Sequence, residues 1–188
     1  GLGAMNEELP AFVVMTSKMP HRTNVQALSN RLWSSGFLSP EHAAVALRAG
    51  NDPVLHLGNP PGIDGDVRRA MIDGVNDLNQ QLFDRVGDPE INARISQYEM
   101  AFRMQFEAQE VFDLNHEPKN IREGYGSSPI AQACLTARRL VERGVRVVQI
   151  FTGGGQPWDN HDDIAQHRQL AQQTDQPIAM LLKDLKSK

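Results

Sequence analysis

The chain has 188 residues, of which 40% are hydrophobic and 22% are charged, an ordinary balance for one globular domain with its own core. Its formal net charge of −4 argues against nucleic acid or an anionic membrane as a partner, because binding to either normally needs a basic face. Its single cysteine, Cys134, excludes an internal disulfide and a thiolate zinc site, so a bound metal must use oxygen and imidazole ligands.

The N-terminal third predicts one strand followed by irregular structure. Residues 11–15 (A-F-V-V-M) are apolar with a β-branched centre, which is typical of a buried strand. Residues 16–63 mix proline, serine, glycine and asparagine with isolated apolar residues, so we expect an ordered but irregular excursion. Within it, a serine–proline start and a glycine stop predict a short helix over residues 39–50. We expect Trp33 and Phe37 to attach the excursion to the body.

A helical hairpin is predicted next. The first helix covers residues 66–86 and ends at Gly87, and residues 88–90 (D-P-E) start a second helix that runs on towards Phe112. Each helix carries one apolar stripe, and we expect the two stripes to pack on each other as core. The stripes are Val67, Met71, Val75, Leu78 and Leu82 in the first helix, and Ile91, Ile95, Tyr98, Phe102 and Phe106 in the second.

The C-terminal part predicts a helix, a strand and more helix. A third helix over residues 128–143 ends at a left-handed Gly144, and residues 144–151 (G-V-R-V-V-Q-I-F) read as a buried parallel strand. Two further helices are predicted over residues 163–173 and 176–185, with a proline in the first turn of the second. The pattern predicts an α/β fold. Because a parallel sheet usually has more than two core strands, we expect residues 1–188 to form a single domain that is an internal part of a larger one.

The segment after the last predicted strand is the strongest candidate site. It reads F-T-G-G-G-Q-P-W-D-N-H-D-D, and in open α/β sheets ligands bind at the carboxyl ends of the strands. Asp159 and His161 can both ligate a metal, and a loop can direct both at one cation. In the alternative interpretation the segment starts a helix: Asn160 is a good N-cap, Asp162 and Asp163 complement the helix dipole, and Trp158 is core.

Other polar groups give weaker signals. The glycines at 153–155 lack the lysine and hydroxyl of a phosphate-binding loop, so we expect them only to turn the backbone tightly. Asp163 and His167 could share a cation, although an i, i+4 surface pair is the commoner outcome. Thr152 lies at the end of the predicted strand, and its hydroxyl is close enough to the candidate site to be considered with it. On the third helix we expect Cys134 to be inert core.

Arg138 and Arg139 lie on the predicted polar face of the same helix as Glu142. They could bind an anion, but we expect a solvated, salt-paired surface.

Several segments in order resemble a known family. They include L-P-A-F-V-V at residue 9, I-S-Q-Y-E-M-A-F-R-M-Q at residue 95, C-L-T-A-R-R-L-V-E-R-G-V-R-V-V-Q-I at residue 134, and W-D-N-H at residue 158. Together with shorter matches these cover nearly the whole chain. The chain is similar to sulfatase-like proteins of unknown function, abundant in planctomycetes, within the alkaline phosphatase superfamily.

The resemblance implies a metal-dependent hydrolase of phosphate or sulfate esters on a partial alkaline phosphatase-like three-layer α/β sandwich. Asp159 and His161 fall where the family pattern W-D-x-H contributes to one metal, so a divalent cation (zinc, calcium, magnesium or manganese) is the implied cofactor of the intact protein. A small-molecule or glycan ester is the implied substrate. The family's earlier metal-binding aspartate, its nucleophile region and its later motifs E-F-G-R-T-P and D-H-H do not occur here, so we expect this piece to bind metal weakly and to be inactive. The catalytic residues therefore remain unknown.

The alternative to a hydrolase is a protein without catalysis, and a separate expectation concerns association. A non-catalytic binding or assembly protein could have kept the fold after losing the chemistry. An incomplete sheet also leaves strand edges, which we expect either to pair with another copy as a homo-oligomer or to be covered by residues 16–63.

Overall fold

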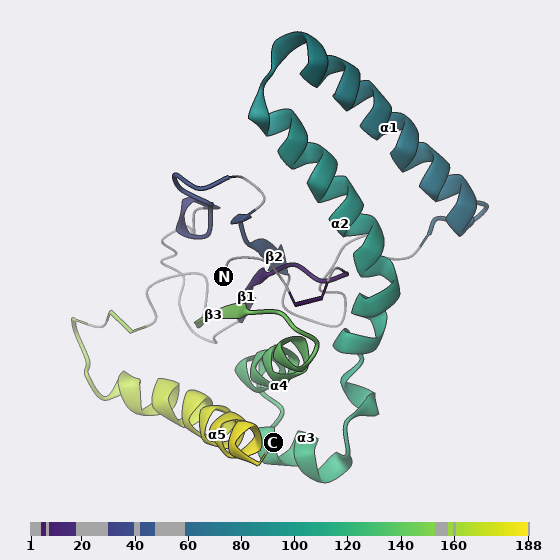
Figure 1. Ribbon diagram of the computed structural model, residues 1–188. Coiled ribbons are helices and arrows are strands. Elements are labelled where there is room, and N and C mark those ends of the chain that lie inside the picture. The colour runs from purple at the N-terminus through teal and green to yellow at the C-terminus, as the bar shows by residue number, and fades with distance from the viewer. Residues whose placement is uncertain are drawn as a thin grey trace.

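The computed structural model describes residues 5–6, 8–17, 30–39, 42–47, 59–152, 158–159 and 161–187. These residues form a small parallel sheet with helices packed on it, and a helical hairpin that projects away from the sheet (Figure 1). The expected α/β class is confirmed. The three glycines at 153–155, which we expect to turn the backbone tightly, and the predicted N-cap Asn160 lie outside the described residues.

The sheet has three parallel strands in the order β2-β1-β3. The strands are β1 (Phe12–Ser17), β2 (Val45–Leu47) and β3 (Val147–Thr152). The register pairs Val13 with Val45 on one side, and it pairs Ser17 with Thr152 on the other. The carboxyl ends of β1 and β3 therefore lie next to each other at the same end of the sheet.

The strand β2 corrects the prediction of a helix over residues 39–50. Val45, Ala46 and Leu47 are extended and pair with β1, and Leu47 is buried in the core. The alanine-rich sequence has good helix propensity, but pairing with a central strand and burial of Leu47 outweigh such weak local preferences. The strand also means that the excursion itself covers one edge of β1. The predicted strand at 144–151 exists as β3, but it is an edge strand among the described residues, and Val147 is exposed rather than buried.

Helices cover one face of the sheet. The core on this face joins Val13 and Met15 of β1 to Leu140 of α4 (Pro129–Glu142) and Met104 of α2 (Pro89–Phe112). Consecutive strand residues point to opposite faces, and on the other face the ring of Phe151 meets Trp33, with 5.8 Å between their centroids. The prediction that Trp33 attaches the excursion is confirmed. The same prediction for Phe37 is wrong, because this side chain is 98% exposed.

A second core lies between α3 (Lys119–Tyr125), α4 and α5 (Gln166–Lys186). Ser128 caps α4, accepting a 3.2 Å hydrogen bond from Ala131 N, and Cys134 is buried as predicted. The remaining short elements are the 3-10 turns η1 (Asn30–Leu32) and η3 (Leu114–His116). Among the described residues no helix is both long and apolar enough to cross a membrane.

Arg138 and Arg139 are buried, which overturns the prediction of a solvated surface. Both guanidinium groups bind Glu117, which follows η3, and Arg138 also binds Glu142 at 2.7 Å. The helical spacing placed these side chains off the apolar stripe, but η3 and α5 pack over that side of α4 and bury it. Buried cations persist only when they are paired, and here each is.

The predicted pair of C-terminal helices is one helix, α5, with Pro177 inside it. A proline in a helix interior removes one hydrogen bond and costs about 3 kcal/mol. Met180 and Leu181 of α5 pack on the second core and Pro177 is buried, so tertiary packing continues the helix through this position.

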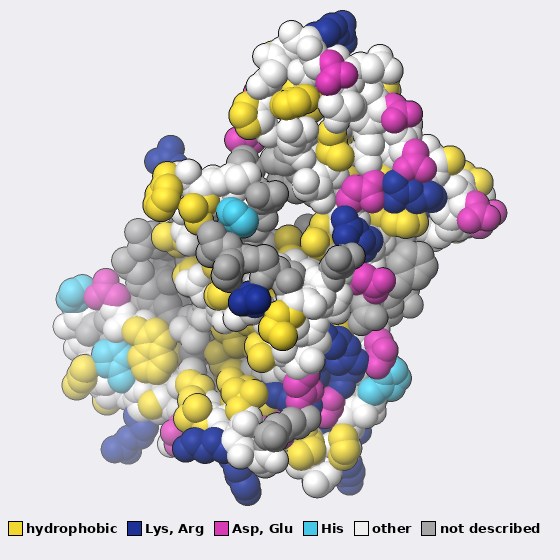
Figure 2. All heavy atoms as spheres, in the orientation of Figure 1, with side chains coloured by type: hydrophobic (Ala, Val, Ile, Leu, Met, Phe, Trp, Pro, Cys, Tyr) yellow, Lys and Arg dark blue, Asp and Glu magenta, His cyan; other side chains and the backbone are white. Residues whose placement is uncertain are grey.

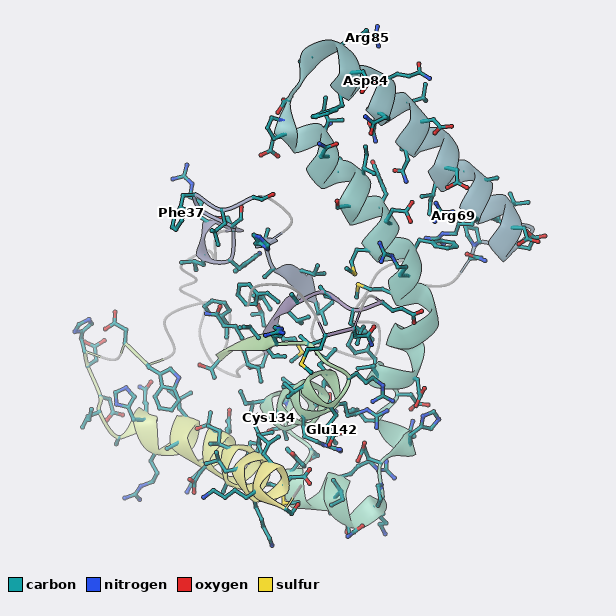
Figure 3. The ribbon with its side chains drawn as sticks, in the orientation of Figure 1. Phe37, Arg69, Asp84, Arg85, Cys134 and Glu142 are labelled. Carbon is teal, nitrogen blue, oxygen red and sulfur yellow. The ribbon has the colours of Figure 1, made fainter. Side chains whose placement is uncertain are left out.

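The hairpin forms as predicted from α1 (Gly65–Val86) and α2, with Gly87 in a left-handed conformation at φ 69° between them. The side of α1 that faces α2 is not the predicted apolar stripe and includes polar contacts, which corrects the expected packing of stripe on stripe. Arg69 binds both carboxylate oxygens of Glu99 at 2.8 Å, Asn76 donates to Glu99 at 2.6 Å, and Arg69 lies over the ring of Phe102 (Figure 3). The predicted apolar stripe of α1 is exposed along its whole length.

Candidate functional site

Two hydroxyl groups lie at the carboxyl ends of β1 and β3. Ser17 is buried and its Oγ donates to the carbonyl of Phe151 at 3.2 Å. Thr152 is its register partner on β3. In this class of fold ligands bind at this end of the sheet, so it is the natural place for a site.

The two predicted metal ligands lie beside each other beyond the end of β3. His161 Nε2 is 2.6 Å from Asp159 Oδ1, and the two side chains are 86% and 45% exposed. Because a carboxylate only accepts, Nε2 must carry the proton that joins them. An exposed pair of this kind contributes at most about 1 kcal/mol to stability, so separating the two groups to admit another ligand costs little.

Trp158, the residue before this pair, has its indole N–H and its backbone carbonyl both hydrogen-bonded. Trp158 Nε1 donates to Thr152 Oγ1 at 3.0 Å, and the Trp158 carbonyl accepts from His167 Nε2 at 2.8 Å. The indole and imidazole rings also stack, at 6.0 Å between centroids and 14° between planes. These contacts tie the chain around residue 158 to the end of β3 and to the first turn of α5. Trp158 is 42% exposed, so the interpretation of this residue as core is wrong.

The start of α5 separates the two interpretations of the segment. The helix begins at Gln166 with Ala165 at the N-cap position, so neither Asp159 nor His161 is the cap. Asp163 serves the helix start, because its Oδ1 accepts from Ala165 N at 2.9 Å. Asp163 thus lies just before the helix, which starts later than predicted, and the predicted cap Asn160 is outside the described residues. His167, the other member of the predicted Asp163 and His167 pair, binds the Trp158 carbonyl.

The donor chemistry of Asp159 and His161 suits a divalent cation. Two ligands of a tetrahedral metal lie about 3.3 Å apart, so the pair would have to open by less than about 1 Å. Among the described residues, however, no group of three or more histidine, cysteine, aspartate or glutamate side chains is arranged to hold a metal. A catalytic metal normally has three protein ligands. The two residues thus fit part of a cation site.

Ser17 and His167 have roles at this end of the sheet that sequence reasoning did not assign. The sequence did contain a signal for Ser17. This hydroxyl residue lies two positions after the predicted first strand, and the carboxyl ends of parallel strands meet at the same end of a sheet. His167 gave no such signal, since its partner is a backbone carbonyl nine residues earlier. Of the other histidines, His116 lies 3.6 Å from Asp113 on the surface, and His21 and His56 lie outside the described residues.

Comparison with known proteins places the chain in a family without a known activity. The sequence matches the family described as Protein of unknown function (DUF1501) over residues 1–188. It shows no significant similarity to a curated protein or to a solved structure. Because the match covers the whole sequence given, the chain belongs to the DUF1501 family.

Proposed function

We propose that the chain contributes one corner of the cation site of a metal-dependent hydrolase acting on phosphate or sulfate esters. The observation that carries the proposal is the approach of Asp159 Oδ1 to His161 Nε2, at 2.6 Å, just beyond the carboxyl end of β3. An alkaline phosphatase-like arrangement, as the sequence resemblance implies, puts its cations at this end of the sheet.

Each residue has a definite part in the proposal. Asp159 and His161 hold the cation (zinc, calcium, magnesium or manganese), which when bound polarises the ester oxygen of a small-molecule or glycan substrate. Thr152 and His167 fix Trp158 from two sides, so they position the backbone that carries Asp159. To hold a cation through Nε2, His161 would have to carry its ring proton on Nδ1 instead.

The proposal predicts weak binding in this chain. Two protein ligands leave the cation short of the three that a catalytic site needs, so we expect dissociation constants of about 0.1 mM or weaker and no turnover. The remaining ligands and the nucleophile would come from polypeptide beyond the described residues.

Isothermal titration with zinc and with manganese tests this. We expect Asp159→Asn and His161→Gln each to weaken binding at least about tenfold, because each removes one of two ligands. The matched controls Asp162→Asn and His116→Gln remove the same chemical groups from exposed neighbouring or remote positions and should leave the affinity unchanged. Binding that persists in Asp159→Asn/His161→Gln would put the metal elsewhere and defeat the proposal.

A non-catalytic binding or assembly function is the second candidate, and one observation favours it. The apolar side chains along α1 are exposed, and surfaces of this kind commonly mark a protein interface. Association that depends on α1, in a chain whose titration shows no metal binding, would select this candidate.

A further inference from the structure

One side of α1 is apolar and exposed. Six hydrophobic side chains, between 40% and 67% exposed, follow one another along the helix. We name this surface the α1 apolar face. It consists of Val67, Met71, Val75, Leu78, Leu82 and Val86. Figure 2 shows exposed hydrophobic side chains over the projecting hairpin, among charged ones.

The face is distinct from the side of α1 that binds α2. Arg69 and Asn76 bind Glu99 of α2, and the half-buried Ile72, Asn79 and Phe83 lie on the same side of α1. At 100° per residue, the centre of the α1 apolar face lies roughly a third of a turn away from theirs. Packing within the hairpin therefore leaves this face open.

A third side of α1 is acidic and marks where the helix meets water. Asp66, Asp73, Asp77 and Asp84 share it, and all four are exposed. A helix in contact with one neighbour needs one apolar side and one polar side. With separate α2-facing, acidic and apolar sides, α1 has the pattern of a helix with two neighbours, of which α2 is one.

The α1 apolar face is complementary to itself when two copies run antiparallel. With the twofold axis between Gly74 and Val75, Met71 lies opposite Leu78 of the other copy. In the same register Val67 lies opposite Leu82. Gly74 lies beside the axis at the margin of the face, and no atom lies within 4 Å of the position a Cβ would take there.

The charges at the two ends agree with the same register. At 100° per residue, Asp64, the N-cap of α1, lies in line with the apolar face at one end, and Arg85 flanks it at the other. Antiparallel pairing brings the Asp64 of one copy opposite the Arg85 of the other, twice. In parallel pairing each of these side chains would lie opposite the same charge on the other copy, which is unfavourable.

We propose that the α1 apolar face is the contact between two copies of this chain, paired antiparallel as a symmetric dimer. The pairing is isologous, so it closes on itself and does not extend into a filament. One helix face supplies fewer than the roughly 20 to 30 residues a side of a standard interface, so we expect dissociation in the micromolar range. The inference is independent of the proposed metal site, because the hairpin projects away from α5 and from the segment that carries Asp159 and His161 (Figure 1).

Sedimentation velocity from about 1 to 200 μM tests the dimer, a range that brackets micromolar dissociation. We expect a shift from monomer to dimer in the unmodified chain. Leu78→Asp puts a charge at the centre of the face and should leave a monomer at every concentration. Gln81→Asp adds the same charge to the same helix outside the face and should still dimerise, and circular dichroism checks that both variants remain helical.

Engineered cysteines test the orientation. A chain carrying Met71→Cys mixed with one carrying Leu78→Cys should form a mixed disulfide dimer on mild oxidation, and Met71→Cys alone should form none. The native Cys134 is buried and does not interfere.

Three outcomes would overturn the proposal. A chain that is monomeric throughout the range would show that another polypeptide segment or partner covers the face. Dimers that survive Leu78→Asp would point to another surface, such as the sheet edges. Ready self-linking of Met71→Cys would show parallel pairing.

Discussion

Glu117 joins three helices through the two arginines that it binds. It contacts Arg138 and Arg139 of α4, and Arg138 Nε also lies 3.2 Å from Asp184 Oδ2 of α5. Asp184 in turn accepts a 3.1 Å hydrogen bond from the buried Tyr125 of α3. Burial opposes the charged form of Glu117, but hydrogen bonds from both arginines outweigh it and lower the pKa of this carboxyl. The cluster is therefore charged at neutral pH.

Glu117→Gln should reduce the free energy of unfolding by about 3 kcal/mol at pH 7, because it leaves two buried guanidinium groups short of their shared anion. A carboxyl with a lowered pKa contributes stability above its ordinary pKa of 4.5 and loses it as the pH falls through the folded value. The difference between wild type and variant in urea denaturation should thus shrink below about pH 4.5.

The matched control is Glu123→Gln. Glu123 is an exposed acid 3.6 Å from Lys119 on the neighbouring helix α3, and its loss should cost less than about 0.5 kcal/mol. Equal effects of the two substitutions would contradict a special role for Glu117.

Cys134 should not react while the protein is folded. Burial raises the pKa of its thiol to about 11, so little of the reactive thiolate is present at pH 8. Labelling with a disulfide reagent should be slow in buffer and complete in denaturant, and Leu182→Cys, at a position that is 54% exposed, provides a reactive site for comparison. Fast labelling of native Cys134 would show that α4 opens readily.

At the scale of the elements, the sequence predicted structure best where local signals were strong. Ser128 and Pro129 start α4, and Gly87 ends α1, because caps and left-handed turns depend on a few neighbouring residues. The sequence-based prediction was wrong where tertiary contacts determine the secondary structure. β2 exists because β1 pairs with it, and α5 continues through Pro177 because the second core holds it. The α2-facing side of α1 is set by Glu99, on the other helix, which no spacing within α1 reveals.

The candidate site was predictable to the same extent. The position of Asp159 and His161 after a strand could be seen in the sequence, and so could the chemistry of both groups. Their separation could not, nor could the contacts of Trp158 with Thr152 and His167, because these join residues from three different segments. The metal-ligand role itself stays a prediction.

The turn between α4 and β3 depends on a glycine at Gly144. Its φ is 94°, and a Cβ there would lie 3.0 Å from Met5 Cβ and 3.2 Å from Asn6 N. Gly144→Ala should therefore lower the free energy of unfolding by at least about 1 kcal/mol through backbone strain, with the close contacts adding to it. Gly74→Ala in α1, where nothing lies within 4 Å, should instead raise stability by about 0.5–1 kcal/mol. Thermal unfolding of both variants measures the contrast, and a neutral Gly144→Ala would show that the N-terminal segment does not pack there.

At the scale of the whole molecule, α1 and α4 differ in how firmly the rest of the described chain holds them. α4 lies between both cores and buries nine of its residues. α1 buries none, and polar contacts of Arg69 and Asn76 with Glu99 help to hold it to α2. Local opening is easiest where few apolar contacts hold an element, so the hairpin should open without unfolding of the sheet and its helices.

Hydrogen exchange followed by mass spectrometry should therefore show slow exchange in α4 and fast exchange in α1 at low protein concentration. If two copies pair through the α1 apolar face, exchange in α1 alone should slow as the concentration rises, since the dimer covers the helix that packing within the chain leaves open. Leu78→Asp should abolish this concentration dependence without changing exchange in α4. Slow exchange in α1 at the lowest concentration would show that the hairpin is stable by itself, and a concentration effect confined to β3 would instead place association at the edge of the sheet.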